Sequence, residues 1–407
     1  MEHFSVIQTL CRIGLEGTDP RFRKQVERLR DRLRTGGDEK AVTALDRLLA
    51  GVSSEHSLMS PSAVEVSRQL VTGDELTANI HPPADRETSV PLAEVILDPG
   101  VGRPLPIYSE TLTLALGAML DEWKQVGALR AMGVEPSRSC LIYGPPGTGK
   151  TLTAFWLAAQ LRLPVINARI DGLVSSFLGT TARNIANLFA FANRYRCMLV
   201  LDEFDALAKM RDDPHEVGEI KRVVNTLLQN LDARAGTGLT LAITNHDALL
   251  DPAVWRRFEN HIRIDLPDER TRFVMLNAFL DPLDVDDDVV RTLTFIVGQR
   301  SGSFLKNFAD ALKRVLALGR LDVSATTILA AAKALVPRLG IGENRLSPAS
   351  MFVSDEASFV GALLNSGMPI RQASVAKMLG VSQSTISRYA QDYVAREAPR
   401  EGLTNAQ

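Results

Sequence analysis

The feature that most constrains the fold is a glycine-rich segment, Gly144-Pro145-Pro146-Gly147-Thr148-Gly149-Lys150-Thr151. It matches the pattern G-x-x-x-x-G-K-[ST], in which backbone N–H groups turn inward around phosphate oxygens. The apolar run 140–143 precedes it, and apolar residues at helical spacing follow from Leu152. The pattern requires a strand, a loop and a helix N-terminus in that order. The segment therefore predicts a phosphate-binding loop in an α/β domain.

Short apolar runs alternate with helical patterns on both sides of this loop. The runs include Cys140–Tyr143, Pro164–Ile166, Met198–Leu201 and Leu239–Ile243. Continuous apolar strands separated by helices are typical of a parallel sheet that is covered on both faces. The expected fold class is therefore α/β, with a P-loop parallel sheet sandwiched by helices.

The rest of the chain divides by its pattern into helical and linking segments. Apolar residues recur at helical spacing near the N-terminus, and prolines and small polar residues dominate the stretch that follows. After the α/β segment, only helical patterns remain. The expected parts are an N-terminal helical domain (1–52), a linker (53–88), the α/β domain (89–268), a helical region (269–345) and a C-terminal helical module (350–398).

Two carboxylates, Asp202 and Glu203, follow the apolar run 197–201. The carboxyl ends of strands are where α/β folds bind ligands. Asp202 is suited to hold Mg²⁺ through its water shell, together with the Thr151 hydroxyl. Glu203 can take a proton from an attacking water as a general base. Many strands end in Asp, so the alternative interpretation is a plain strand cap.

Composition excludes several classes of protein. Lys and Arg number 46 against 48 Asp and Glu, and 45% of the residues are hydrophobic, so neither a disordered chain nor a strongly basic nucleic-acid coat protein is expected. No apolar stretch reaches the ~18 residues of a membrane span, and no secretory signal is readable. Cys11, Cys140 and Cys197 are too scattered for a disulfide framework or a zinc site. We therefore expect a cytoplasmic protein without membrane partners.

Four motifs in this order resemble the AAA branch of the AAA+ ATPases, and most closely its katanin-like remodelling members. They are Gly144–Thr151, Leu201-Asp202-Glu203-Phe204-Asp205-Ala206-Leu207, Ile243-Thr244-Asn245 and Asp251-Pro252-Ala253-Val254-Trp255-Arg256-Arg257-Phe258. The resemblance implies an enzyme that binds ATP and Mg²⁺, hydrolyses ATP and assembles with itself in a nucleotide-dependent ring, usually a hexamer. It also implies that residues 269–345 form a helical lid.

The resemblance assigns roles to individual residues. The implied nucleotide contacts are Gly144, Pro145, Pro146, Gly147, Thr148, Gly149, Lys150, Thr151 and Leu152. Asn245 matches the residue that positions the attacking water, although an Asn at a strand end is otherwise a turn residue. Arg256 and Arg257 match the arginine fingers that reach the nucleotide of a neighbouring subunit. Without the family they are a surface pair, and the sequence leaves open which one is the main finger.

A second family feature is the segment Phe177-Leu178-Gly179. It stands where relatives have an aromatic–hydrophobic–Gly pore loop that grips a threaded polypeptide. It departs from the family at Thr180, where relatives often carry an acid. The alternative interpretation is that Phe177 belongs to the core.

The C-terminal module resembles a helix-turn-helix over residues 373–389. Ala376 is small where two helices cross, Gly380 stands at the turn, and Ser382 is a natural N-cap. Fold alone does not give function. Residues 383–388 could read DNA, but such modules also dock proteins. Because residues 350–407 are balanced in charge, we expect weak, salt-sensitive DNA binding that needs assembly of several copies.

Two functions from different classes follow. The first is a ring-forming AAA+ ATPase that remodels or unfolds a protein client, either alone or for a separate effector or protease. The alternative is a DNA-associated AAA+ regulator that uses its C-terminal helix-turn-helix. A nucleotide-gated scaffold with little turnover is disfavoured by Glu203 together with the arginine pair.

Overall fold

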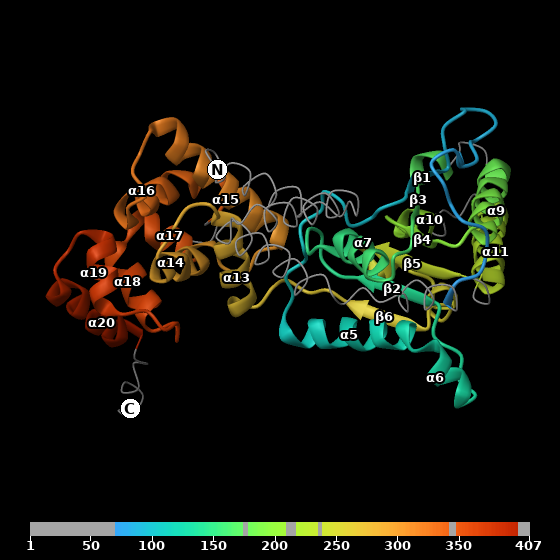
Figure 1. The fold of residues 1–407 in the computed structure, drawn as a ribbon. Helices are drawn as coiled ribbons and strands as arrows, with labels where there is room; N and C mark the ends of the chain where they lie inside the picture. The colour runs from blue at the N-terminus through green and yellow to red at the C-terminus, as the bar shows by residue number, and fades with distance from the viewer. Residues whose placement is uncertain (1–69, 174–177, 209–216, 235–237, 342–346, 398–407) are drawn as a thin grey trace, which may run out of the picture. The chain divides into compact units, whose positions relative to one another are not determined.

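The computed structural model describes residues 70–173, 178–208, 217–234, 238–341 and 347–397 (Figure 1). The N-terminal helical domain predicted for residues 1–52 lies outside these ranges. Within them, six strands form one sheet in the order β1-β3-β4-β5-β2-β6. Their bounds are β1 (Ala93–Ile96), β2 (Ser139–Tyr143), β3 (Val165–Ala168), β4 (Met198–Leu201), β5 (Leu239–Thr244) and β6 (Asn260–Arg263). Neighbouring strands are parallel except for β1, which pairs antiparallel with β3, so the predicted α/β fold is confirmed.

Helices cover both faces of the sheet, because the strands carry apolar side chains in both directions. Along β2, Leu141 belongs to one hydrophobic core, and Cys140 and Ile142 belong to the other. The first core is closed by α9 (Leu178–Arg194) and α11 (Val217–Arg234), which lie side by side in Figure 1. The second is closed by α5 (Glu110–Lys124) and α7 (Lys150–Gln160). Shorter elements of this domain are α6 (Val126–Ala131), α8 (Ile170–Leu173), α10 (Asp205–Ala208), η2 (Asp247–Leu249) and α12 (Pro252–Trp255).

The stretch just before the sheet packs against it. The sequence places residues 70–88 in a linker because they are rich in small polar residues, yet Leu70 and Leu76 are buried in the two cores. Asp85 is also buried, and its carboxylate accepts a hydrogen bond from Asn184 of α9 at 2.6 Å. This second half of the predicted linker is therefore bound to the α/β domain.

The region after the sheet is helical, and polar caps mark where its helices begin. It contains α13 (Glu269–Leu280), α14 (Asp287–Val297), α15 (Gly302–Gly319), α16 (Ala325–Leu335) and η3 (Pro337–Leu339). The side chains of Asp268, Ser301 and Ser324 each accept a backbone N–H at the start of a helix. Among the described residues, none of the helices combines the length and the apolar character that crossing a membrane requires.

The C-terminal helices share the core of this helical region. They are α17 (Pro348–Ser354), α18 (Glu356–Leu364), α19 (Gln372–Leu379) and α20 (Gln383–Glu397). One hydrophobic cluster runs from Met275 of α13 to Ile386 of α20. Gly380 ends α19 in the left-handed conformation, at a φ of 69°, and the Val381 N–H donates to the Ala376 carbonyl at 3.1 Å. The helix pair is thus mounted directly on the preceding helices.

Candidate active site

The glycine-rich loop joins β2 to α7 in a shape that only glycine allows. Gly144, Gly147 and Gly149 have φ values of 137°, 75° and 97°. Side chains are strained in this region of backbone space. A Cβ on Gly144 would also collide with the backbone carbonyl of Ile264, just after β6. The loop therefore wraps the N-terminus of α7, where backbone N–H groups favour an anion.

Lys150 is held inside this loop. Its side chain is buried, and its ammonium group donates to the carbonyl oxygens of Gly144 at 2.8 Å and Pro145 at 2.7 Å. Burial lowers the pKa of Lys150, and the charges of Asp202 and Asp205 oppose that shift. A phosphate oxygen can replace these neutral carbonyl acceptors with a stronger, charge-assisted hydrogen bond.

The acidic residues that follow β4 lie beside the phosphate loop. The Thr151 hydroxyl donates to Asp202 Oδ2 at 2.8 Å. A hydroxyl beside a carboxylate is an oxygen donor set that suits Mg²⁺, so these two residues could hold that ion. Glu203 is exposed and has a φ of 52°, an uncommon conformation for a residue with a side chain. Such strain is concentrated at functional sites.

Two hydrogen bonds fix the ends of β4 and β5 to each other. The Phe204 N–H donates to the Ile243 carbonyl at 2.8 Å, and the Thr244 hydroxyl donates to Asp205 at 3.0 Å. The residue that follows β5 is Asn245, which is exposed. These bonds hold Asn245 beside the acidic strand end.

A cavity of about 430 Å³ brings these residues together. Of the predicted site residues, Lys150, Thr151, Asp202, Glu203 and Asn245 all line it. The predicted loop residues Pro146, Gly147, Thr148, Gly149 and Leu152 also line it. A volume in this range suits a small-molecule or cofactor site.

Other lining residues carry no sequence motif. They come from the segment before α5, from α13 and from α15, and they include Tyr108, Met275, Phe279 and Lys306. The helical region also touches the loop, because the Ser303 N–H donates to the Gly147 carbonyl at 3.0 Å. Spacing could not have identified these residues, since they lie on three elements that are far from the glycine-rich loop in sequence.

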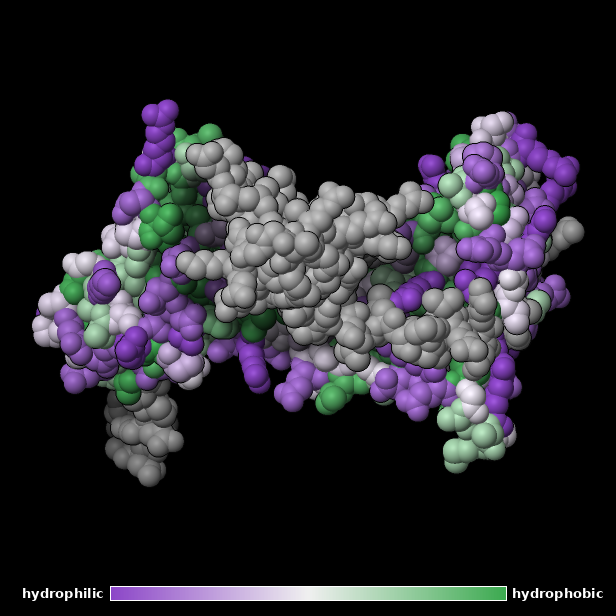
Figure 2. Space-filling view, in the orientation of Figure 1, coloured by the Kyte–Doolittle hydropathy of each residue, from purple (hydrophilic) through white to green (hydrophobic). Residues whose placement is uncertain are grey.

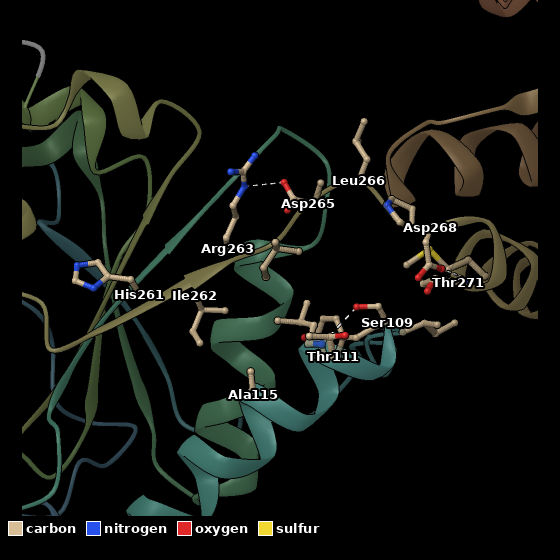
Figure 3. A pocket seen from close by; sticks show the side chains of 17 residues that line it. Ser109, Thr111, Ala115, His261, Ile262, Arg263, Asp265, Leu266, Asp268 and Thr271 are labelled. Atoms are coloured by element: carbon tan, nitrogen blue, oxygen red, sulfur yellow. Dashed lines mark hydrogen bonds and ion pairs between the residues drawn. The ribbon is translucent and has the colours of Figure 1, made fainter.

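A second cavity of about 350 Å³ adjoins the first. It lies between the start of α5, strand β6 and the segment that leads from β6 into α13 (Figure 3). Arg263 donates to Asp265 at 2.8 Å on this connecting segment. Both cavities share Thr148 and Met275, so the connection between the sheet and the helical region borders the phosphate loop.

The arginine pair follows α12, and neither arginine is among the residues that line the main cavity. Arg257 is held by its own chain, with its Nε 2.8 Å from Asp232 Oδ1 on α11. Arg256 is exposed and makes no side-chain ion pair with any described residue. Trp255 stacks on His261 with ring centroids 4.6 Å apart and meets Tyr143 edge-on. The end of α12 is thus packed against the strand that enters the phosphate loop.

The predicted pore loop falls partly outside the described residues. Phe177 lies outside them, and Leu178 and Gly179 begin α9. Thr180 is buried, and its hydroxyl donates to Glu87 at 3.1 Å. Thr180 thereby ties the start of α9 to the segment that precedes the sheet.

The fold and the site together define a P-loop nucleotide-binding protein whose helical region reaches the phosphate loop. Residues 140–266 match the model of the family described as "ATPase family associated with various cellular activities (AAA)". This match covers the phosphate loop, the acidic strand end and the arginine pair, the motifs that resemble the AAA branch.

Several relatives share this domain. An AAA family ATPase named y4kL from Sinorhizobium fredii is 40% identical over 184 residues, which is 45% of this chain and 54% of the relative. The proteasome-activating nucleotidase of Methanopyrus kandleri is 30% identical over 270 residues, or 58% of this chain and 62% of the relative. Among solved structures, the AAA domain of FIGL-1 covers 59% of this chain and 85% of its own, with 22% identity and a TM-score of 0.47. The chain thus spans between half and two thirds of the length of these two curated relatives.

Proposed function

We propose that this chain hydrolyses ATP and uses the reaction to remodel or unfold a protein client. The observation that carries the proposal is the Thr151–Asp202 hydrogen bond beside Glu203, in one cavity with the phosphate loop. Phosphoryl transfer needs positioned charges more than covalent chemistry. This cavity combines a buried cation, a site for a hard metal ion and an exposed carboxylate.

Each residue has a separate task in the proposed reaction. Lys150 contacts the phosphates and neutralises their charge. Thr151 and Asp202 hold Mg²⁺, which neutralises phosphate charge when it is bound. Glu203 takes a proton from the attacking water, and Asn245 orients that water.

The arginine pair supports an assembled form. Arg256 and Arg257 do not line the cavity of their own chain, which supports a role at the nucleotide of a neighbouring subunit. We therefore propose a nucleotide-dependent ring, with the hexamer as the expected form. Phe177 would line the centre of this ring and grip the client.

The client is proposed to be a protein, partly because of the relatives. Two of them are named as a proteasome-activating nucleotidase and a 26S proteasome regulatory subunit, the latter from Schizosaccharomyces pombe and 34% identical over 179 residues. By analogy, this chain would deliver an unfolded client to a separate effector or protease.

Mixing two inactive variants tests hydrolysis and assembly together. The variant Arg256→Ala/Arg257→Ala keeps an intact pocket, and Lys150→Ala keeps intact arginines. Neither should turn over ATP alone, and a mixture should regain part of the activity because each subunit supplies what its neighbour lacks. Full activity in a protein that remains monomeric with ATP would contradict the proposal.

A second candidate function is ATP-driven remodelling at DNA. The observation that favours it is the α19–α20 pair. These helices pack against the helical core and expose polar residues to solvent. The ATP cycle would be the same, and only the partner would differ.

A further inference from the structure

We propose that α19 and α20 form a binding surface for duplex DNA, with the first turns of α20 in the major groove. This inference deepens the second candidate function and names its partner. An α-helix fits the major groove, and helix-turn-helix proteins place the start of the second helix against the bases. The contacts, exposure and charge of residues 371–396 support this proposal.

The packing of α20 decides which of its residues face outward. Ile386 is fully buried against the helical core. Gln383, Ser384 and Arg388 are exposed, and Ser384 and Arg388 are four residues apart on one face. Gln and Arg side chains can make paired hydrogen bonds to adenine and guanine.

Hydrogen bonds fix the two helices in one geometry. The Ser382 hydroxyl caps α20 by accepting the Thr385 N–H at 3.2 Å. At the start of α19, the Gln372 amide oxygen accepts the Ser387 hydroxyl at 2.9 Å. Its amide nitrogen therefore remains available, at an exposed helix start, to donate to a phosphate. A site preorganised in this way loses little side-chain entropy on binding.

Charge is unequally distributed within the C-terminal module. Residues 371–397, which span α19 and α20, carry four basic side chains (Arg371, Lys377, Arg388 and Arg396) and two acidic side chains (Asp392 and Glu397). Two of the module's other acids, Asp355 and Glu356, lie at the start of α18. The charge of Arg396 helps to lower the pKa of Asp355, after the stronger effect of hydrogen bonds from Ser358. Lys377 and Arg388 make no ion pair with any described residue, so both can neutralise phosphates.

The polarity of the surface favours DNA over a protein partner. Among the described residues of α19 and α20, Val394 is the one large apolar side chain that is exposed, and it lies toward the far end of α20. Hydrophilic and neutral residues cover most of this part of the molecule on the face that Figure 2 shows. Protein interfaces usually need an apolar or aromatic centre.

Contacts between α19 and the preceding helices connect the DNA-binding surface to the rest of the ATPase. The Thr292 hydroxyl of α14 lies 3.7 Å from Met378 Sδ of α19, and Arg371 Nε lies 3.7 Å from Asp288 Oδ2. The helix pair is therefore packed on the helical region that contacts the phosphate loop. In an assembled ring, several weak copies would act together on one duplex.

Fluorescence anisotropy with a labelled duplex of mixed sequence tests the proposal on the full chain, with a non-hydrolysable ATP analogue. We expect binding at low salt that weakens as salt rises. Lys377→Ala and Arg388→Ala should each weaken it and reduce the salt slope by about 0.9, the value for one lost phosphate contact. Arg396→Ala, on the same helix, is the matched control and should leave the slope unchanged, because Arg396 lies in the last turn of α20, far from the first turns that enter the groove.

Two results would overturn the DNA surface. One is the absence of binding at low salt in the nucleotide-bound state. The other is an equal loss in Arg388→Ala and Arg396→Ala, with unchanged thermal unfolding midpoints for both. ATP turnover of the wild-type chain is measured separately without DNA. An active ATPase that ignores DNA would therefore reject this surface and leave the proposed ATPase function standing.

Discussion

Arg256 should be the arginine that acts on a neighbouring nucleotide, and Arg257 should contribute much less. The perturbations are Arg256→Ala, Arg257→Ala and Asp232→Asn. Arg257 lies 2.8 Å from Asp232, whereas Arg256 projects without an ion pair within the described part of the chain. An arginine that is already oriented away from its own chain can reach a neighbour without breaking a contact.

The expected effects of the two arginine substitutions differ by orders of magnitude. The side chains of Arg257 and Asp232 are 41% and 51% exposed, so their ion pair is worth at most ~1 kcal/mol. An arginine that stabilises the transition state of phosphoryl transfer is worth roughly 10³–10⁵ in rate. We therefore expect Arg256→Ala to lose about a thousandfold or more in turnover. Arg257→Ala should lose less than about tenfold, near the value of a single weak pair.

The assay is steady-state ATP turnover at saturating ATP, with the assembly state of each variant checked by sedimentation. Asp232→Asn is the control: it should retain turnover and lower the free energy of unfolding by no more than ~1 kcal/mol. Equal losses in the two arginine variants would show that the ion pair with Asp232 does not determine which arginine acts.

Three further outcomes follow from contacts in the structure. Lys306→Ala should weaken the binding of both ATP and ADP in a titration, because Lys306 lines the nucleotide cavity. Lys306 and Lys313 both form an ion pair with Asp310, so Lys313→Ala is the control and should leave nucleotide binding unchanged. Hydrogen bonds from Asn184 and from the backbone of Thr88 lower the pKa of Asp85 to about 2 from 3.8, so its stabilising contribution is complete above about pH 4 and is lost as the pH falls through about 2. Urea unfolding should show this acid dependence in the wild type and a weaker one in Asp85→Asn. Gly361→Ala should destabilise the C-terminal helices, because its Cβ would collide with Tyr393 of α20; an unchanged melting temperature would show that the two helices can separate.

The contiguous parts of the site are readable from sequence, and the parts assembled from distant elements are not. The phosphate loop and the pair Asp202–Glu203 each lie on one strand and its following turn, so residue types and spacing are enough to predict them. Met275, Phe279 and Lys306 reach the same cavity from two helices beyond the sheet. No local pattern distinguishes them from other helix residues.

The sequence also does not predict which side chains on distant elements contact each other. The Arg257–Asp232 ion pair joins α11 to the turn after α12, and nothing in either segment indicates that they meet. In the same way, the small polar residues before β1 suggest a linker, because composition does not show that Leu70 and Leu76 fill gaps beside the sheet. In both cases tertiary packing decides the outcome.

In the proposed reaction, Glu203 acts on the attacking water while Lys150 binds the phosphates. Its most direct test measures ATP affinity and single-turnover hydrolysis for Glu203→Gln and Lys150→Ala. We expect Glu203→Gln to bind ATP with near wild-type affinity and to lose about a hundredfold or more in hydrolysis, within the ~10²–10⁴ range of general acid–base catalysis. Lys150→Ala should lose ATP affinity itself. Hydrolysis at the wild-type rate in Glu203→Gln would show that Glu203 is not the general base.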